Sequence, residues 1–231
     1  MEAIGFDLGD TLIYYNNVPL NWNDCYISAF RRIIDGMELS SRNELIDIGC
    51  RVLSKYNTRV YPRDHEVRDI DIFCEIHKAW GISDQGVDQT IRDFFSYFQQ
   101  GSIPYEDTLS TMRFLKHSGI KIGILTDVPY GMNRELVLRD ITPFREYIDF
   151  IITSVDVGFR KPCVEGYLQL AKELGCPPNE MYYVGNEKKD IDGANSIGIK
   201  SILVNRIEAK LEWGQNETIR NLSEIKRFCK K

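Results

Sequence analysis

The sequence of 231 residues lacks the features that mark a membrane protein or a nucleic-acid-binding protein. Its apolar runs are shorter than the roughly 18 consecutive residues that a membrane-spanning helix needs. Basic residues are in the minority, with 29 Lys and Arg against 34 Asp and Glu and a net charge of −5. A surface dedicated to nucleic acid or anionic lipid is therefore not expected. We predict neither a nucleic-acid partner nor a membrane partner.

Cysteine and histidine are also sparse. The six cysteines are far apart in the sequence, without a C-x-x-C pair, and three histidines are present. This pattern predicts neither a disulfide framework nor a zinc site. The first residues, MEAIGFD, contain no basic segment of the kind that begins a secretory signal peptide. Together these features predict a cytoplasmic globular protein with reduced thiols.

The beginning and the second half of the sequence share one pattern, in which short apolar runs alternate with amphipathic stretches. The runs of strand length are 3–6, 120–125, 148–152, 181–184 and 199–204. After the third run, Val164, Tyr167 and Ala171 have helical spacing, and Gly175 follows as a stop signal. Strands that alternate with helices predict an open, parallel α/β sheet covered on both faces.

The stretch from 15 to 101 has a different pattern. Four sets of apolar residues with helical spacing follow one another there, for example Val87, Ile91, Phe94 and Phe98. No strand-like run separates them. The sequence therefore predicts an all-helical domain at 15–101, inserted into an α/β core that is formed by 1–14 and 102–231.

Polar side chains follow the predicted strands where each strand ends. In an open parallel sheet, ligands bind beyond the carboxyl ends of the strands, so these residues are expected to share one site. They are Asp7, Gly9 and Asp10, then Thr126 and Asp127, then Lys161, and finally Asn186, Glu187 and Asp190. Each alone is typical of a turn or a helix cap. Several carboxylates at one edge repel, however, and a divalent cation with a lysine is their natural neutraliser.

In their order and spacing, four segments resemble the haloacid dehalogenase-like hydrolases, which are mostly phosphatases. The segments are FDLGDTL at 6–12, ILTD at 124–127, GFRKP at 158–162 and VGNEKKDIDGA at 184–194. The resemblance covers nearly the whole chain. It implies a flavodoxin-like (Rossmann-like) core with a mobile helical cap at the place of the insert. It also implies a Mg²⁺-dependent hydrolase of a small phosphorylated metabolite.

The resemblance also implies a role for each site residue. Asp7 would be the nucleophile that forms an aspartyl-phosphate intermediate. Lys161 and Mg²⁺ would neutralise the phosphate charge, and Thr126 with backbone groups beside it, at Asp127, would hold the transferring oxygens. The implied metal ligands are Asp7, the Gly9 carbonyl, water and a group from among Asn186, Glu187 and Asp190.

Two positions depart from the family's pattern. Gly9 stands two residues after the nucleophile, where the phosphatases usually have the acid/base aspartate, and Asp10 comes next. Because Gly9 has no Cβ, we expect its backbone to let Asp10 reach the leaving group as the proton carrier. Asn186 stands where an aspartate ligand is usual, which predicts weaker binding of Mg²⁺.

Two alternative functions remain open at this point. In a metal-independent 2-haloacid dehalogenase, Asp7 would displace halide from carbon, and Gly9 agrees with such an enzyme because relatives of that type lack the second aspartate. A non-catalytic protein that binds a phosphate ligand would tolerate both Gly9 and Asn186. The sequence identifies neither the substrate nor the oligomeric state.

Overall fold

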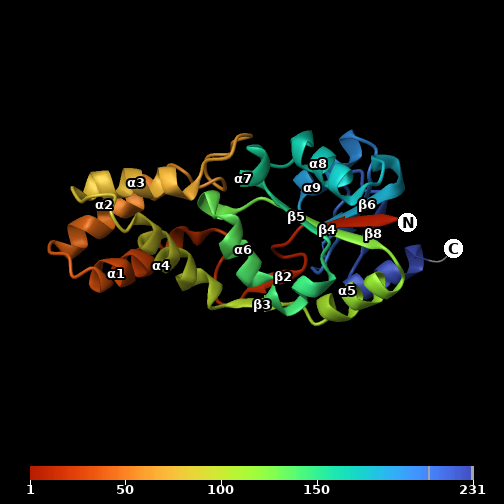
Figure 1. The fold of residues 1–231 in the computed structure, drawn as a ribbon, viewed down its shortest axis with the longest axis horizontal. Helices are drawn as coiled ribbons and strands as arrows, with labels where there is room; N and C mark the ends of the chain where they lie inside the picture. Colours follow the sequence, from red (N-terminus) through yellow and green to blue (C-terminus); the bar gives the residue numbers. More distant parts are fainter. Residues whose placement is uncertain (208, 230–231) are drawn as a thin grey trace.

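A six-stranded sheet lies at one end of an elongated molecule, and four helices lie at the other end (Figure 1). The computed structural model describes residues 1–207 and 209–229. All neighbouring strands in the sheet are parallel. Their order across the sheet is β5 (Phe150–Thr153), β4 (Lys121–Thr126), β1 (Ala3–Phe6), β6 (Met181–Gly185), β7 (Lys200–Val204) and β8 (Glu217–Ile219). This confirms the predicted parallel α/β sheet and adds one strand, β8, that the sequence did not predict.

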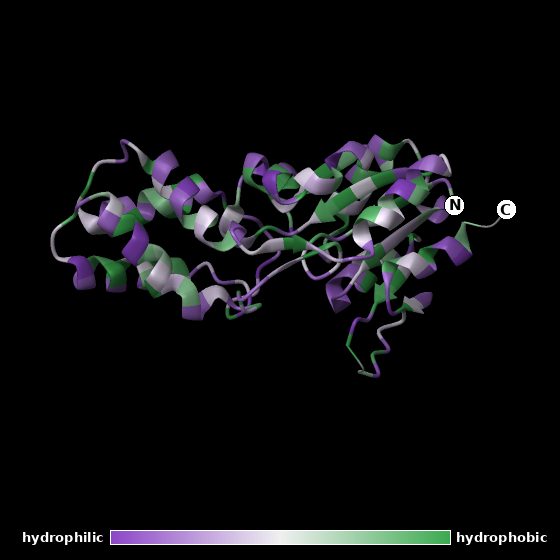
Figure 2. Ribbon diagram, turned by 90° about the horizontal axis from the view of Figure 1, so that it is seen from below, coloured by the Kyte–Doolittle hydropathy of each residue, from purple (hydrophilic) through white to green (hydrophobic). Residues whose placement is uncertain are grey.

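Helices cover both faces of the sheet. Helix α5 (Thr108–His117) lies on one face, and α8 (Val164–Leu174) and α9 (Lys188–Ser196) lie on the other (Figure 1). Because side chains alternate along a strand, Ile4 and Phe6 pack into the α5 layer whereas Ala3 packs into the α8 layer. In Figure 2 the hydrophobic colour is concentrated on the strands of the sheet, as expected for strands that are buried on both faces.

Four helices lie between residues 15 and 101, where four apolar patterns predict them. They are α1 (Tyr26–Gly36), α2 (Arg42–Ser54), α3 (Asp69–Trp80) and α4 (Val87–Gln99). Their buried faces are rich in aromatic side chains: Phe94 and Phe98 of α4 are fully buried, and the ring of Trp22 stacks on Phe98 with centroids 3.8 Å apart. This aromatic packing supplies the contact area that a group of short helices needs.

A small antiparallel ribbon joins the helices to the sheet. It consists of β2 (Ile13–Tyr15) and β3 (Ser102–Pro104), in which Tyr15 pairs with Ser102. The expected boundary 14/15 falls within β2, and the expected boundary 101/102 lies directly before β3. Strands of three residues carry too short a pattern to be predicted, and the division into core and cap itself stays a prediction.

The connections contain further short elements. Gly175 ends α8 in the left-handed conformation with φ 59°, which confirms the predicted stop signal. In the described part of the chain, no helix combines the length and the apolar character that crossing a bilayer requires. The remaining short elements are α6 (Arg134–Asp140), α7 (Ser154–Val157) and the 3₁₀ turns η1 (Trp22–Cys25), η2 (Pro129–Gly131), η3 (Thr142–Tyr147), η4 (Pro178–Glu180) and η5 (Leu222–Phe228).

Candidate active site

A buried lysine lies between two aspartates at the carboxyl edge of the sheet. Lys161 Nζ is 2.5 Å from Asp7 Oδ1 and 2.7 Å from Asp190 Oδ1. The three residues follow β1, β5 and β6, and neither the Lys161 nor the Asp190 side chain is more than 2% exposed. The parallel strands thus bring together residues that are distant in sequence, as the strand-end pattern predicts.

The charges in this cluster do not balance, because one lysine faces two carboxylates. Burial raises the pKa of Asp7 to about 7, although Lys161 acts to lower it. For Lys161, burial acts to lower the pKa, but the carboxylates of Asp190 and Asp7 raise it well above its ordinary value. Lys161 is therefore a permanent cation beside a carboxyl group whose charge is only partly compensated.

The chain turns sharply after Asp7 and presents Asp10 to the same cavity. The Leu8 carbonyl accepts hydrogen bonds from three successive backbone N–H groups, those of residues 11–13. Asp10 itself has the left-handed conformation, with φ 56°, whereas Gly9 lies outside that region. The unusual backbone is thus at Asp10, not at Gly9 as the sequence suggested. Burial and the nearby charge of Glu187 raise the pKa of Asp10.

Thr126 and Asp127 end β4 beside the lysine. Thr126 is buried and lines the cavity. The Asp127 carboxylate accepts the backbone N–H of Lys161 at 2.9 Å and forms an ion pair with Lys189 Nζ at 2.9 Å. Burial acts to raise the pKa of Asp127, but Lys189, Lys161 and Arg160 together lower it. Its side chain therefore braces the loop that carries Lys161.

Two acids at the start of α9, Glu187 and Asp190, form ion pairs and accept hydrogen bonds from backbone N–H groups. Asp190 Oδ2 accepts the backbone N–H groups of Asn186 and Glu187, at 3.1 and 2.9 Å. An added Cβ at Gly185 would lie 2.3 Å from the Asp190 side chain, so only glycine permits this close return. Glu187 is paired with Arg59 and with Lys189, and these cations lower the pKa of Glu187 to about 2 against the effect of burial.

The Asn186 side chain is not part of these ion pairs, and its amide faces the loop of residues 7–13 that follows β1. Its end that faces the loop lies 3.0 Å from Thr11 Oγ1, 3.1 Å from the Gly9 carbonyl oxygen and 3.3 Å from Asp7 Oδ2. The Asp7 carboxylate, the Gly9 carbonyl and the Asn186 amide thus meet at one point, and all three offer oxygens of the type that Mg²⁺ prefers. The set fits a weakly held Mg²⁺, because it contains a single carboxylate, which Lys161 shares.

A cavity of about 430 Å³ opens over these residues, and residues that the sequence analysis missed line its far side. Arg59 comes from the segment between α2 and α3, and Tyr130 and Asp140 come from the region after β4. Tyr15 and Trp22 also line the cavity. For Arg59, Tyr130 and Asp140, positions in loops and at element ends gave no periodic signal that could have predicted this placement.

The segment 57–68 is attached to the sheet end of the molecule by a second buried ion pair. Glu66, with a side chain 2% exposed, is paired with Arg160 and accepts a hydrogen bond from the Ser154 hydroxyl at 2.6 Å. The backbone N–H of Arg160 donates to the Asp64 carbonyl at 2.8 Å. These contacts hold Arg59 over the cavity.

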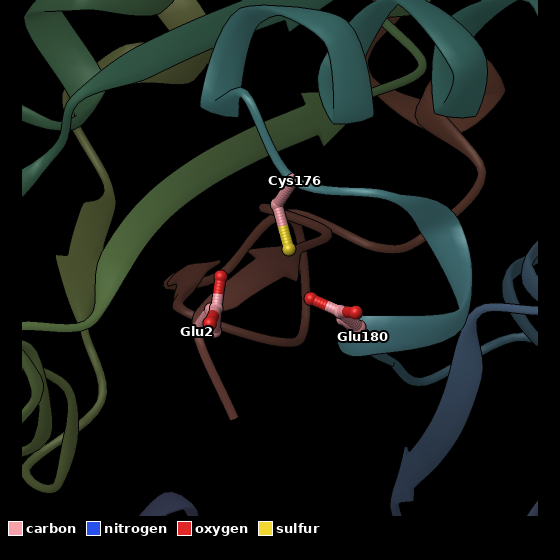
Figure 3. A group of neighbouring side chains, drawn as sticks. All are labelled: Glu2, Cys176 and Glu180. Atoms are coloured by element: carbon pink, nitrogen blue, oxygen red, sulfur yellow. The ribbon is translucent and has the colours of Figure 1, made fainter.

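At the opposite, amino end of the strands, Glu2, Cys176 and Glu180 point toward one another (Figure 3). Their ligand atoms lie within 4.8 Å of one another. Burial raises the pKa of the Cys176 thiol, and the carboxylates of Glu2 and Glu180 raise it further. Glu2 and Glu180 are exposed, and exposed acids commonly lie together without an ion, so we assign no metal to this cluster.

A family model for haloacid dehalogenase-like hydrolases matches residues 21–204. The chain belongs to this family. The haloacid dehalogenase-like fold is also found in solved structures that cover nearly the whole chain. A phosphatase of the family from Thermococcus onnurineus has a TM-score of 0.70 at 23% identity, over 99% of this chain and 97% of that one. A 2-haloacid dehalogenase from Pseudomonas syringae pv. Tomato has a TM-score of 0.68 at 19% identity, over 98% and 97%. At these identities the likeness shows the fold alone.

Several curated relatives match a shorter region of the chain. A glyceraldehyde 3-phosphate phosphatase from Methanothermobacter thermautotrophicus is 32% identical over 103 residues, which are 44% of this chain and 45% of the relative. The chain thus spans a little under half the length of this relative. Family and fold are confirmed, and the activity is a matter for proposal.

Proposed function

We propose that this chain is a Mg²⁺-dependent phosphatase that hydrolyses a small phosphorylated metabolite through an aspartyl-phosphate on Asp7. The observation that carries the proposal is the Asp7–Lys161–Asp190 cluster at the carboxyl edge of the sheet, of which Asp7 and Lys161 line the cavity and Asp190 lies buried behind them. The names of the curated relatives, which are phosphatases, support the same class of reaction.

In the first step, an Asp7 carboxylate oxygen attacks phosphorus while the bond from phosphorus to the leaving oxygen breaks. An anion that approaches a phosphate must be neutralised, and Lys161 Nζ, 2.5 Å from Asp7, supplies a fixed cation. Lys161 is held by Asp190, whose own oxygens are anchored to the backbone at the start of α9. The cation is therefore oriented before the substrate arrives.

Thr126 and the neighbouring backbone N–H groups would hold the phosphoryl oxygens, with Asp127 as the brace behind them. Asp7, the Gly9 carbonyl and Asn186 would hold Mg²⁺, with Glu187 and Asp190 adding charge from the surrounding ion pairs. When bound, Mg²⁺ would supply further neutralisation of the charge on the phosphoryl group.

Asp10 is the proposed proton carrier. It would give a proton to the leaving oxygen, which takes the electron pair of the broken bond. In the second step its carboxylate would remove a proton from water as the water oxygen attacks phosphorus, which releases inorganic phosphate and restores Asp7. The position of Asp10 on the wall of the cavity supports this role.

Helices α1–α4 and the segment 57–68 would act as the cap over the cavity. The ion pairs of Arg59 with Glu187 and of Glu66 with Arg160 join this region to the sheet loops. A closed cap would keep water away during the first step. The cavity volume of about 430 Å³ accommodates a metabolite of moderate size.

A substrate panel tests the proposal. Phosphomonoesters and 2-haloacids would each be incubated with Mg²⁺ and with chelator, and the release of phosphate or halide would be measured. We expect phosphate release that requires Mg²⁺. Asp7→Asn should release phosphate far more slowly, and Asp192→Asn is its matched control, because Asp192 is a partly exposed acid on α9 that pairs with Lys188.

The other outcomes identify the alternatives. Halide release that persists in chelator would indicate the metal-independent dehalogenase. Binding of phosphate esters without turnover of either class would indicate the non-catalytic ligand-binding protein. Either result would contradict the proposed phosphatase.

A further inference from the structure

The side chain of Asn186 meets an unusual set of neighbours. Three oxygen atoms surround one end of its amide group: the Gly9 carbonyl at 3.1 Å, Asp7 Oδ2 at 3.3 Å and Thr11 Oγ1 at 3.0 Å. The first two are acceptors only, and the Thr11 hydroxyl has a single hydrogen. The surroundings therefore favour a donor, or a cation, at this point.

An oxygen of Asn186 at this point would face the Gly9 and Asp7 oxygens with no hydrogen to share between them. The amide nitrogen carries two hydrogens, so turning the amide about its last bond lets it donate to the Gly9 carbonyl and to Asp7 Oδ2. The Thr11 hydroxyl can then donate its own hydrogen to Asp7 Oδ2, at 3.5 Å. A partly buried site without a cation stabilises the orientation that pairs its acceptors.

We infer that the Asn186 amide nitrogen takes the place of the metal when the site is metal-free, donating to the Gly9 carbonyl and to Asp7 Oδ2. Asn186 is thus a positioning residue for the nucleophile. The inference deepens the proposed function and rests on it, because it concerns the metal of the same site. An aspartate at 186 could not do this, since its carboxylate would repel Asp7.

These hydrogen bonds should weaken the binding of Mg²⁺. Before Asn186 can offer its oxygen to Mg²⁺, its nitrogen must leave Gly9 and Asp7, so the hydrogen bonds and the metal compete for the same atoms. Glu187 and Asp190 do not compete in this way, because their carboxylates are held by Arg59 and Lys189 and by Lys161 and backbone N–H groups. Asn186 alone in this loop would respond to the metal.

Asn186→Asp tests the inference, with Asn43→Asp on the exposed side of α2 as the control of equal charge change. Melting temperatures would be measured in chelator, and Mg²⁺ affinities by calorimetry. We expect Asn186→Asp to lower the metal-free melting temperature by about 2–4 °C and to tighten Mg²⁺ binding about tenfold. Asn43→Asp should change neither quantity.

An unchanged metal-free melting temperature in Asn186→Asp would overturn the inference. A lower melting temperature of Asn186→Asp without tighter Mg²⁺ binding would show that the Asn186 hydrogen bonds do not compete with the metal. Neither measurement uses turnover, so a failure of the proposed phosphatase activity is read separately, from the substrate panel.

A measurement on the unaltered protein covers the case in which Asn186→Asp does not fold. The side-chain amide signals of Asn186 in a nitrogen–proton NMR spectrum can be assigned by their loss in Asn186→Ala. We expect these signals to move when Mg²⁺ is added, because the hydrogen bonds to Gly9 and Asp7 are lost. Signals that stay in place at saturating Mg²⁺ would overturn the inference.

Discussion

Two sets of ion pairs meet at the cavity, and they differ in burial. In the first set, Lys161 lies between Asp7 and Asp190, with side chains 2%, 11% and 0% exposed. In the second, Glu187 pairs with Arg59 across the mouth, with side chains 23% and 39% exposed. Breaking a buried pair leaves an uncompensated charge, whereas water replaces most of an exposed contact. The first set should therefore determine stability and chemistry, and the second should make a small contribution to closing the cavity.

The largest expected effect comes from removing the buried cation. Lys161→Met leaves Asp7 and Asp190 without their common partner, so the free energy of unfolding at pH 7 should fall by about 3–5 kcal/mol. Lys188→Met is the control, because Lys188 forms an exposed ion pair with Asp192. Urea unfolding followed by circular dichroism measures both. Equal losses in the two variants would contradict the difference between buried and exposed pairs.

The second-largest expected effect is on kcat, and it comes from proton transfer at residues 9 and 10, in the loop after Asp7. A Cβ added at Gly9 would meet nothing within 4 Å, so Gly9→Asp should fold normally. Because positioned acid/base catalysis contributes typically ~10²–10⁴-fold, a second acid at the usual family position should raise kcat at least about tenfold. Gly9→Asn has the same shape without the proton and should not raise kcat. Equal kcat values for the two variants would show that proton transfer does not limit turnover.

A pH dependence is expected from Asp140, a buried acid on the cavity wall that accepts a 2.5 Å hydrogen bond from the Tyr15 hydroxyl. Burial raises the pKa of Asp140 above 3.8. The native protein then holds a proton that the unfolded chain releases, so this group's contribution to stability is lost as pH rises from 3.8 to its folded value.

Asp140→Asn removes this dependence while keeping an acceptor for Tyr15. The wild type should therefore lose stability relative to Asp140→Asn between pH 4 and pH 7. Urea titrations of both proteins across this range give the difference directly. A difference that does not change with pH would mean that Asp140 titrates alike in the folded and unfolded chains.

The smallest expected effect is at the mouth of the cavity. A double-mutant cycle with Arg59→Ala and Glu187→Gln should give a coupling energy of about 0.2–1 kcal/mol that decreases with added salt. Unfolding in urea at low and high salt measures it. A coupling as large as the loss in Lys161→Met, and insensitive to salt, would remove the distinction between the two sets.

The sequence predicted that Asp7, Lys161 and Asp190 share one edge of the sheet, but it indicated neither the ion pairs of Lys161 with both acids nor the pair of Glu187 with Arg59. Asp7, Lys161 and Asp190 each follow a strand, and parallel strands bring their ends to one edge whatever the details of packing. Arg59 and Glu66 reach the sheet loops only because the segment 57–68 docks there, which no local pattern encodes. The sequence also offered Glu187 as one of three candidate metal ligands, and in the structure its carboxylate is paired with two cations, Arg59 and Lys189.

The secondary-structure elements also divide into those that the sequence predicted and those that it did not. The five predicted strands and the four helices of 15–101 have clear apolar periodicity, and all are present in the structure. Strands β2, β3 and β8 have three residues each, and hydrogen bonding to a neighbouring strand defines them rather than their own composition. The orientation of the Asn186 amide likewise depends on atoms from a distant loop.

The role of Asp7 as nucleophile is tested most directly by Asp7→Asn, which keeps the shape of the side chain and removes its charge. Initial rates of phosphate release would be measured for the best substrate of the panel, at equal concentrations of folded protein. We expect Asp7→Asn to lose at least about a hundredfold in kcat, because a nucleophile has no substitute in covalent catalysis. Retention of more than about a tenth of the wild-type kcat would contradict the aspartyl-phosphate mechanism.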